Sequence, residues 1–338
     1  MSILGIVASS MKGATSPVVI FARSASPYIA AFPWNAGSFG TQYSDPSTSP
    51  TGEVYRLAFD SKAKNIVTSH LTSPYTTAYP WSNGFGSKYS DPVSPPAQNA
   101  SSATFRFDDS VVIVQGSSAN VAAYAWSATG FGSRYSNPAT LPAGVCNDVR
   151  FSPDGTHVAF SHITTPFVTA YPWSSGFGTK YANPASLPSS AGRSVDFSKN
   201  GAAIVVGQDG SPYVSAYPWS SGFGTKYSAP ASTPLGVAFG TRFHPSENVV
   251  GLAVENAKGL QAYAFTSASG WGTKYTDPSL DAAQNAGRGL SWNNDGTYVA
   301  VAVDRTELGA VYPWSAGFGS RVSGTNLGNG FSRDVIMF

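Results

Sequence analysis

The sequence predicts an all-β protein, a seven-bladed β-propeller whose blades are four-stranded and antiparallel. A twelve-residue phrase, AYPWSSGFGTKY, occurs unchanged at residues 170–181 and 216–227, and five looser copies bring the total to seven. An SDP-like tripeptide that ends in proline also recurs, at intervals of 46 to 48 residues. A period in the mid-forties over a whole chain is typical of repeat proteins, and a propeller blade is a repeat of about four strands.

The aromatic residue at the tryptophan position of the phrase recurs every 45 to 49 residues. These seven residues are Trp34, Trp81, Trp126, Trp173, Trp219, Phe265 and Trp314. One sheet cannot cover both of its faces, so each blade must bury them against its neighbours. Burying one large apolar side chain is worth about 1.5–3 kcal/mol. We therefore predict that these aromatic residues pack the blades together.

The fourth unit shows the strands expected of each blade. Val149 and Phe151 alternate with polar neighbours, a PDG turn follows, and residues 157–162 alternate again. A TTP turn leads to a third run at 167–171, and an SSG turn leads to a fourth at 177–181. Period-two alternation between clusters of Gly, Pro, Asp and Ser is the pattern of strands joined by tight turns.

The small residues of the phrase have structural interpretations. Glycines such as Gly176 and Gly178 allow positive φ and a close backbone approach where the third strand turns into the fourth. The proline before the tryptophan cannot donate a ladder hydrogen bond. Because Ala125 and Ala264 replace it in two copies, we expect this proline at a strand end or a bulge.

The two ends of the chain are predicted to close the ring. Phe338 follows Trp314 by 24 residues, as Phe197 follows Trp173, whereas Lys12 occupies the position where the first unit should have its first strand. Residues 335–338 are therefore expected to complete the first blade, which removes exposed sheet edges. Residues 1–338 then form a single domain. The apolar stretch at 3–8 is an extra or a competing strand.

Composition excludes several functions. Only 11% of the residues are charged and the net charge is +2, so neither nucleic acid nor an anionic membrane is an expected partner. Cys146 is the only cysteine of the sequence, which rules out an intrachain disulfide and a cysteine metal cluster. The N-terminal apolar run is too short to span a bilayer and lacks the pattern of a signal peptide. We expect no metal, no cofactor and no membrane insertion.

The segment FSPDGTHVAFSH at 151–162, followed by a strand that ends in tryptophan, resembles the WD-repeat class of β-propellers, and NNDGTYVAVAV at 293–303 supports the likeness. No unit has aspartate after the tryptophan or opens with a Gly-His pair, so the histidine–aspartate network of eukaryotic WD repeats is absent. The phrase YPWSxGFGxKYSDP instead resembles WD-like proteins of tailed bacteriophages. That likeness implies a virion protein, made in the host cytoplasm, with other virion or structural proteins as partners.

The sequence lacks the motifs of common enzymes. His70 and His162 occupy equivalent positions in different units, where we expect them to hydrogen-bond a turn. Asp154 and Asp295 lie in PDG and NDG turns, where aspartate caps its own backbone. There is neither a GxSxG elbow nor a P-loop. From the sequence we therefore expect no catalytic residues and no enzyme.

Two sets of repeated residues are candidate binding sites. The cations are Lys88, Arg134, Lys180, Lys226, Lys274 and Arg321, and the tyrosines beside them are Tyr89, Tyr135, Tyr181, Tyr227 and Tyr275. Such a ring could bind a glycan or an acidic partner multivalently. We favour the structural interpretation, in which tyrosines pack between blades and cations protect sheet edges.

The function predicted from the sequence is a non-enzymatic binding or structural propeller. Its expected role is that of a bacteriophage virion component that decorates a capsid or tail or adheres to a host surface. The alternative is a multivalent, lectin-like protein that binds surface glycans. The turns between second and third strands differ between units. Loops on a rigid scaffold commonly carry specificity, and loops also vary where nothing constrains them, so both interpretations stay open.

Overall fold

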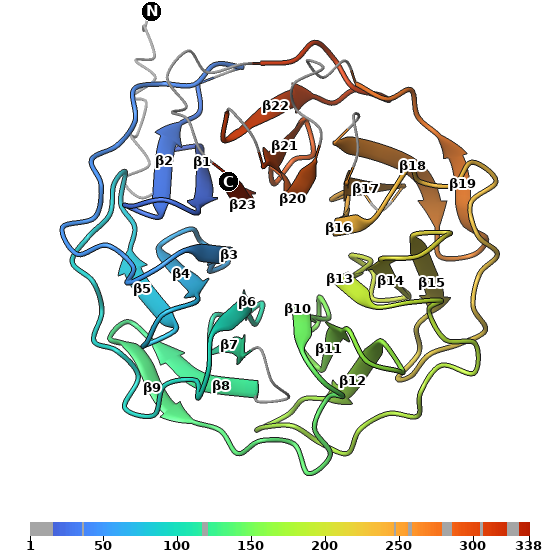
Figure 1. Ribbon diagram of the computed structural model, residues 1–338, viewed down its shortest axis with the longest axis horizontal. Coiled ribbons are helices and arrows are strands. Elements are labelled where there is room, and N and C mark those ends of the chain that lie inside the picture. The colour runs from blue at the N-terminus through green and yellow to red at the C-terminus, as the bar shows by residue number, and fades with distance from the viewer. Residues whose placement is uncertain are drawn as a thin grey trace, which may run out of the picture.

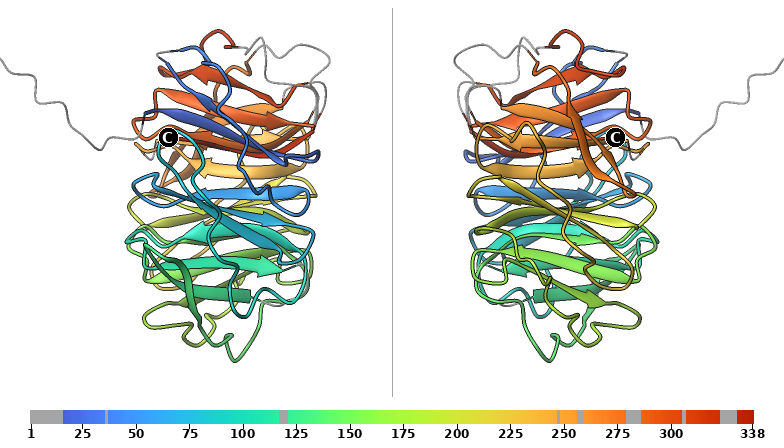
Figure 2. Two further views of the ribbon diagram at one scale, coloured as in Figure 1. Left: turned by 90° about the vertical axis from the view of Figure 1, so that its left-hand side faces the viewer. Right: turned by 90° about the vertical axis from the view of Figure 1, so that its right-hand side faces the viewer.

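In the computed structural model, seven antiparallel sheets are arranged as blades around a central axis (Figure 1). We call the region between their first strands, which side chains occupy, the central channel. The structure describes residues 16–35, 37–116, 121–246, 248–255, 259–278, 286–304, 307–322 and 331–338. The predictions for the stretch at 3–8 and for Lys12 lie outside these residues. The side views show a thick disc in which the strands of the blades are stacked (Figure 2).

Each blade begins with a strand beside the channel and continues outward. Blade 1 contains β23 (Ser332–Met337), β1 (Val18–Arg23) and β2 (Ile29–Pro33). Blade 2 contains β3 (Val54–Phe59), β4 (Asn65–His70) and β5 (Thr76–Pro80), and blade 3 contains β6 (Ala100–Phe105), β7 (Val111–Gly116), β8 (Val121–Ser127) and β9 (Gly130–Arg134). Blade 4 contains β10 (Cys146–Phe151), β11 (His157–His162) and β12 (Val168–Pro172).

The remaining blades repeat the pattern. Blade 5 contains β13 (Gly192–Phe197), β14 (Ala203–Gln208) and β15 (Val214–Pro218), and blade 6 contains β16 (Ala238–Phe243), β17 (Val249–Val254), β18 (Leu260–Thr266) and β19 (Gly270–Lys274). Blade 7 contains β20 (Gly287–Trp292), β21 (Tyr298–Val303) and β22 (Gly309–Pro313). The prediction of a seven-bladed, all-β propeller is confirmed. Within the described ranges, no helix has the length and apolar character needed to cross a membrane.

The fourth segment of a blade is a regular strand only where the phrase lacks proline. Blades 3 and 6 have Ala125 and Ala264 at this position and form β9 and β19. In the other five blades the fourth segment forms an isolated bridge, as between Trp173 and Phe177, and further bonds such as Gly178 N to Pro172 O at 2.9 Å. Because proline has no N–H, the third strand cannot donate to the fourth at this point. The proline ends its strand in all five blades, as predicted.

The two glycines of the phrase have the roles that the sequence predicts. Gly176 has φ of +140°, a conformation that side chains disfavour. A Cβ added to Gly178 would lie 2.6 Å from Cγ of Pro172, so only glycine lets the fourth segment approach the third strand this closely.

The ring closes by pairing the two ends of the described chain. β23 lies antiparallel to β1, and Val18 and Phe338 exchange two backbone hydrogen bonds of 3.0 Å. The predicted C-terminal strand of blade 1 is confirmed, and it is longer than residues 335–338. Closure places the first strands of all seven blades around the channel (Figure 1).

Candidate functional site

The five predicted tyrosines lie between neighbouring blades. Each packs edge-to-face against the aromatic residue of the next blade, with ring centroids 4.9–5.7 Å apart. The pairs are Tyr89 with Trp126, Tyr135 with Trp173, Tyr181 with Trp219, Tyr227 with Phe265, and Tyr275 with Trp314. Aromatic pairs of this geometry stabilise beyond their buried area. The structure thus places these tyrosines, with the seven blade-packing aromatics, in the contacts that hold the blades together.

The six predicted cations have partners close to their own corner of the rim. Lys88 and Lys274 pair with Asp91 and Asp277 at 2.5 and 2.6 Å, and Lys180 donates to Asn183 at 2.5 Å. The other three bond as follows: Lys226 to Leu187 O, Arg134 to Pro95 O and Val121 O, and Arg321 to Glu307. The ring is therefore spread around the circumference and is not gathered into one site. Its binding role stays a prediction.

The equivalent histidines bond turns, as predicted. His70 lies with Nε2 2.8 Å from Oγ1 of Thr77 and Nδ1 2.8 Å from the carbonyl oxygen of Thr72. Burial lowers the pKa of His70 to about 4, so its ring is neutral at pH 7. Gln208 takes the same place in blade 5 and bonds Gly210 and Ser215. An amide can replace this imidazole, so the position needs a hydrogen-bonding group and not a base.

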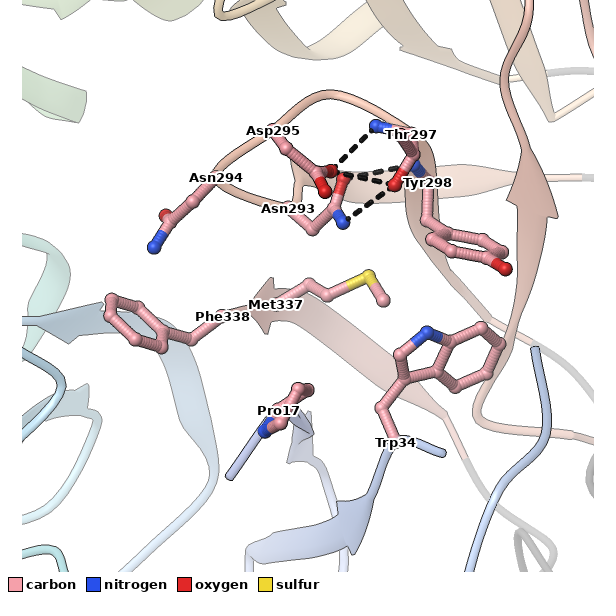
Figure 3. A pocket seen from close by; sticks show the side chains of 9 residues that line it. All are labelled: Pro17, Trp34, Asn293, Asn294, Asp295, Thr297, Tyr298, Met337 and Phe338. Carbon is pink, nitrogen blue, oxygen red and sulfur yellow. Dashed lines mark hydrogen bonds between the residues drawn. The ribbon is translucent and has the colours of Figure 1, made fainter. Parts of the chain in front are cut away.

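A crevice of about 350 Å³ lies at the seam between blades 7 and 1 (Figure 3). Trp34 and Tyr298 form its wall, with ring centroids 5.2 Å apart, and Met337 points toward Trp34. The polar groups above them bond one another, since Asp295 accepts from the Thr297 backbone N–H at 2.9 Å and from its hydroxyl at 2.6 Å. These hydrogen bonds lower the pKa of Asp295. Asp295 therefore stabilises its own turn, as predicted.

A different arrangement occurs at one mouth of the central channel. The second residue of each first strand lines a single cavity of about 400 Å³ there. In blade order these residues are Arg333, Tyr55, Ser101, Asn147, Arg193, Phe239 and Arg288. Among these seven residues, blades 5, 6, 7 and 1 contribute three guanidinium groups and a phenyl ring, and blades 2 to 4 contribute hydroxyl and amide groups. Arg56, the next residue of the first strand of blade 2, also lines the cavity. We call this cavity the arginine mouth.

Each of the three arginines is held by a carboxylate. Nε and Nη2 of Arg193 donate to the two oxygens of Asp209 at 2.5 and 2.7 Å. Arg288 Nε donates to Asp304 at 2.7 Å, and Arg333 Nε donates to Glu53 at 2.7 Å. None of these carboxylates lines the cavity. They hold the guanidinium groups of the three arginines that line the cavity.

Aromatic rings support the same guanidinium groups. The Phe239 ring lies 4.3 Å from the guanidinium carbon of Arg288 and 5.9 Å from that of Arg193. The Tyr55 ring lies 5.2 Å from that of Arg333. These cation–π contacts orient the cationic half of the mouth.

Beneath the mouth the channel holds buried charges. Asp148 lies between Arg150 and Arg242, at 3.5 and 3.2 Å. Burial raises the pKa of Asp196 to about 7 and that of Asp334 to about 6. Among the residues that the structure describes, no group of three or more His, Cys, Asp or Glu side chains could hold a metal ion.

Sequence reasoning missed the arginine mouth because it looked for residues that recur. The mouth lies at one repeated position occupied by different residues. The signal in the sequence was an arginine second in three first strands, GRSVDF, GRGLSW and SRDVIM. Reading that position across units would have found Arg193, Arg288 and Arg333 together.

No family model and no curated protein matches this chain. Solved structures do match. The periplasmic gluconolactonase of Pseudomonas aeruginosa has a TM-score of 0.71 at 16% identity, over 95% of this chain and 99% of that one. A Bacteroides fragilis protein provisionally named as a 6-phosphogluconolactonase has a TM-score of 0.71 at 12% identity, over 97% and 99%. The β-propeller domain of Cps50 (Swd1) from Myceliophteria thermophila has 0.62 at 10%, over 80% and 86%. At these identities the likeness shows a β-propeller fold.

These matches correct the function expected from the sequence. The prediction of a non-enzymatic virion component, with a glycan-binding protein as its alternative, is wrong: two whole-chain matches carry the names of lactonases, and neither is a phage protein. The aromatic residues of the phrase pack the blades together, so the phrase reports on the scaffold and carries no information about function.

Proposed function

We propose that this chain is a hydrolase that opens the lactone ring of an anionic sugar acid at the arginine mouth. The observation that carries the proposal is the convergence of Arg193, Arg288 and Arg333 on one open cavity of about 400 Å³. That volume suits a single monosaccharide-sized ligand. The names of the matched lactonases support the choice of reaction.

The two halves of the mouth fit two parts of such a substrate. Guanidinium groups bind carboxylate and phosphate oxygens strongly through paired N–H donors. The opposite half is lined by Ser101 and Asn147, whose hydroxyl and amide donate to the carbonyl oxygens of Cys146 and Gly192. The oxygen atoms of both side chains can still accept hydrogen bonds from sugar hydroxyls. A substrate with both an anionic group and free hydroxyls would therefore be oriented across the channel.

The residues of the mouth can assist the reaction electrostatically. Water adds to the lactone carbonyl, an oxyanion forms, and the ring C–O bond then breaks to give a carboxylate and a hydroxyl group, with one proton released to solvent. A guanidinium group near the carbonyl stabilises the oxyanion. No carboxylate, histidine or cysteine lines the cavity in the described part of the chain. The rate is therefore expected to rise with pH, as the concentration of solvent hydroxide increases.

The test uses glucono-1,5-lactone and its 6-phosphate ester with the purified chain, and measures acid release above the spontaneous rate. Wild type is expected to accelerate hydrolysis, more so for the phosphate ester. Arg288→Met is expected to lower kcat/KM about 100-fold, whereas Lys180→Met, a matched cation removal at the rim, should leave it unchanged. Failure to accelerate either substrate would overturn the proposal.

The protein partners expected from the sequence form no part of this proposal and stay a prediction.

A further inference from the structure

One arginine in the channel bonds the backbone of the residues that form the cationic half of the mouth. Arg56, from β3 of blade 2, extends across the channel. Its Nη1 donates to the carbonyl oxygen of Arg333 at 2.9 Å and lies 3.5 Å from that of Arg288. Its Nη2 donates to the carbonyl oxygen of Phe239 at 3.1 Å.

These contacts connect blades that are far apart in the sequence. Phe239, Arg288 and Arg333 belong to blades 6, 7 and 1, so a single guanidinium group bonds three adjacent first strands from a fourth. Asp334 supports the arrangement, since its Oδ1 lies 3.8 Å from Nη1 of Arg56 and its Oδ2 accepts from Leu57 N at 3.1 Å. The Asp334 side chain is 3% exposed and that of Arg56 is 11% exposed at the wall of the cavity.

The other channel arginines make different contacts. Arg150 donates to the carbonyl oxygens of Val149, in its own strand, and of Ala103 in the neighbouring blade. Arg242 donates to its own neighbour Thr241 and to Asp148. Neither bonds a residue of the arginine mouth. Arg56 alone among these three joins the backbone of the mouth, and Arg193 is the one mouth arginine whose carbonyl it does not reach.

We infer that Arg56 is a positioning residue, which fixes the Arg288, Arg333 and Phe239 side chains for ligand binding by holding their three strands in place. The inference rests on the proposed function for its catalytic consequence, but the geometry of the mouth can be tested without it. Lysine cannot replace Arg56 fully, because an ammonium group lacks the planar fork that reaches three carbonyl oxygens.

The experiment compares three variants with wild type. Arg56→Met alone would leave Asp334 buried without its cation, so the main variant is the double change Arg56→Met with Asp334→Asn, which removes both charges. Arg56→Lys is the conservative variant. Arg150→Met is the matched control, since it removes another channel cation, 16% exposed against 11% for Arg56, while Asp148 keeps Arg242. Thermal unfolding establishes that each variant is folded.

The first readout needs no ligand. Phenylglyoxal modifies exposed arginines, and mass spectrometry of peptides gives the rate at each one. In the double variant Arg288 and Arg333 are expected to react several-fold faster than in wild type, while Arg193 keeps its rate. Arg150→Met should leave all three rates unchanged. Unchanged rates at Arg288 and Arg333 in the folded double variant would overturn the inference, as would an equal change at Arg193.

The second readout is lactone hydrolysis. A displacement of about 1 Å can cost about 100-fold in rate, so the double variant is expected to lose about that factor in kcat/KM, with Arg56→Lys between it and wild type. If wild type shows no hydrolysis, the proposed function fails, and the phenylglyoxal rates still decide the role of Arg56. If wild type is active and the double variant equals it, the positioning role fails alone.

Discussion

The rim of the propeller and the mouth of its channel use repetition in opposite ways. At the rim the same position holds the same kind of residue in blade after blade, and its ring packs against the next blade. At the mouth one repeated position holds seven side chains, which include three arginines and two aromatic residues. The repeated aromatic residues are alike because every blade has to pack against its neighbours. Different residues at one position create a single asymmetric site on the axis.

The two regions also differ in how substitutions should act. Rim aromatics are largely buried between blades, so removing one leaves a cavity. The mouth arginines are partly exposed and paired with carboxylates, so their loss should affect ligands more than folding. The following predictions test this division.

The largest effect is expected at the rim. Trp173→Ala removes the ring that Tyr135, Phe151 and Phe177 contact at 4.8–5.5 Å. We expect it to lower the free energy of unfolding by about 3–5 kcal/mol, measured by denaturant titration. The folded fraction should keep the rate of lactone hydrolysis that the proposed function expects of wild type. A loss of activity without a loss of stability would contradict the expectation that the aromatic residues between blades act on stability and the arginine mouth acts on ligand binding.

The next effect extends the comparison to the turns. His70→Gln copies the residue that blade 5 already has at Gln208. The pKa of His70 is lowered to about 4 by burial, so between about pH 6.5 and pH 4 the unfolded chain binds a proton that the folded chain does not. His70 therefore favours unfolding as the pH falls through this range, by roughly 3 kcal/mol at its lower end.

The variant should match wild type at pH 7.5 and melt at a higher temperature at pH 4.5. Thermal unfolding followed by circular dichroism at both pH values provides the check. Parallel pH profiles for the two proteins would show that His70 does not contribute to the acid sensitivity. His162, buried in the equivalent turn of blade 4, serves as a second site for the same substitution.

A smaller effect is expected when a blade that has alanine before the tryptophan is given the proline of the other five blades. Ala125→Pro gives blade 3 the proline of the other blades and removes one donor toward β9. The loss of one ladder bond should cost about 1 kcal/mol. Hydrogen exchange should become faster in residues 130–134 and remain unchanged elsewhere. Faster exchange across all of blade 3 would mean that β9 holds the blade together, contrary to the structure of the five proline blades.

The smallest effect is expected at the aromatic residue of the mouth. Phe239→Leu removes the ring that lies 4.3 Å from the Arg288 guanidinium but keeps an apolar side chain. We expect the binding free energy of the reaction product, the 6-phosphate ester of gluconate, to weaken by about 0.5–1 kcal/mol with no change in thermal stability. Calorimetric titration with this ester measures the change. A loss of stability as large as that of Trp173→Ala would show that Phe239 is needed for folding and not mainly for ligand binding.

Sequence reasoning found the scaffold because the scaffold is repetitive. The spacing of Trp34 through Trp314 predicted the number of blades, and the missing first strand near Lys12 predicted that the C-terminal strand closes blade 1. These features depend on local periodicity and on single residues, which a sequence displays directly. The fourth strand expected at 177–181 is an exception, since only an isolated bridge forms there after the proline that ends the third strand.

What the sequence alone determined is therefore the propeller: its period, its strands, its turn residues and its closure. Only the tertiary structure decided where the site lies. Arg56, Arg193, Arg288 and Arg333 are up to 277 residues apart, and nothing local relates them. They meet because a closed ring brings one equivalent end of every first strand to the same axis, so that contributions from all seven blades converge on one cavity. Because the ring is closed, the residues that differ between repeats at this position together form one binding cavity.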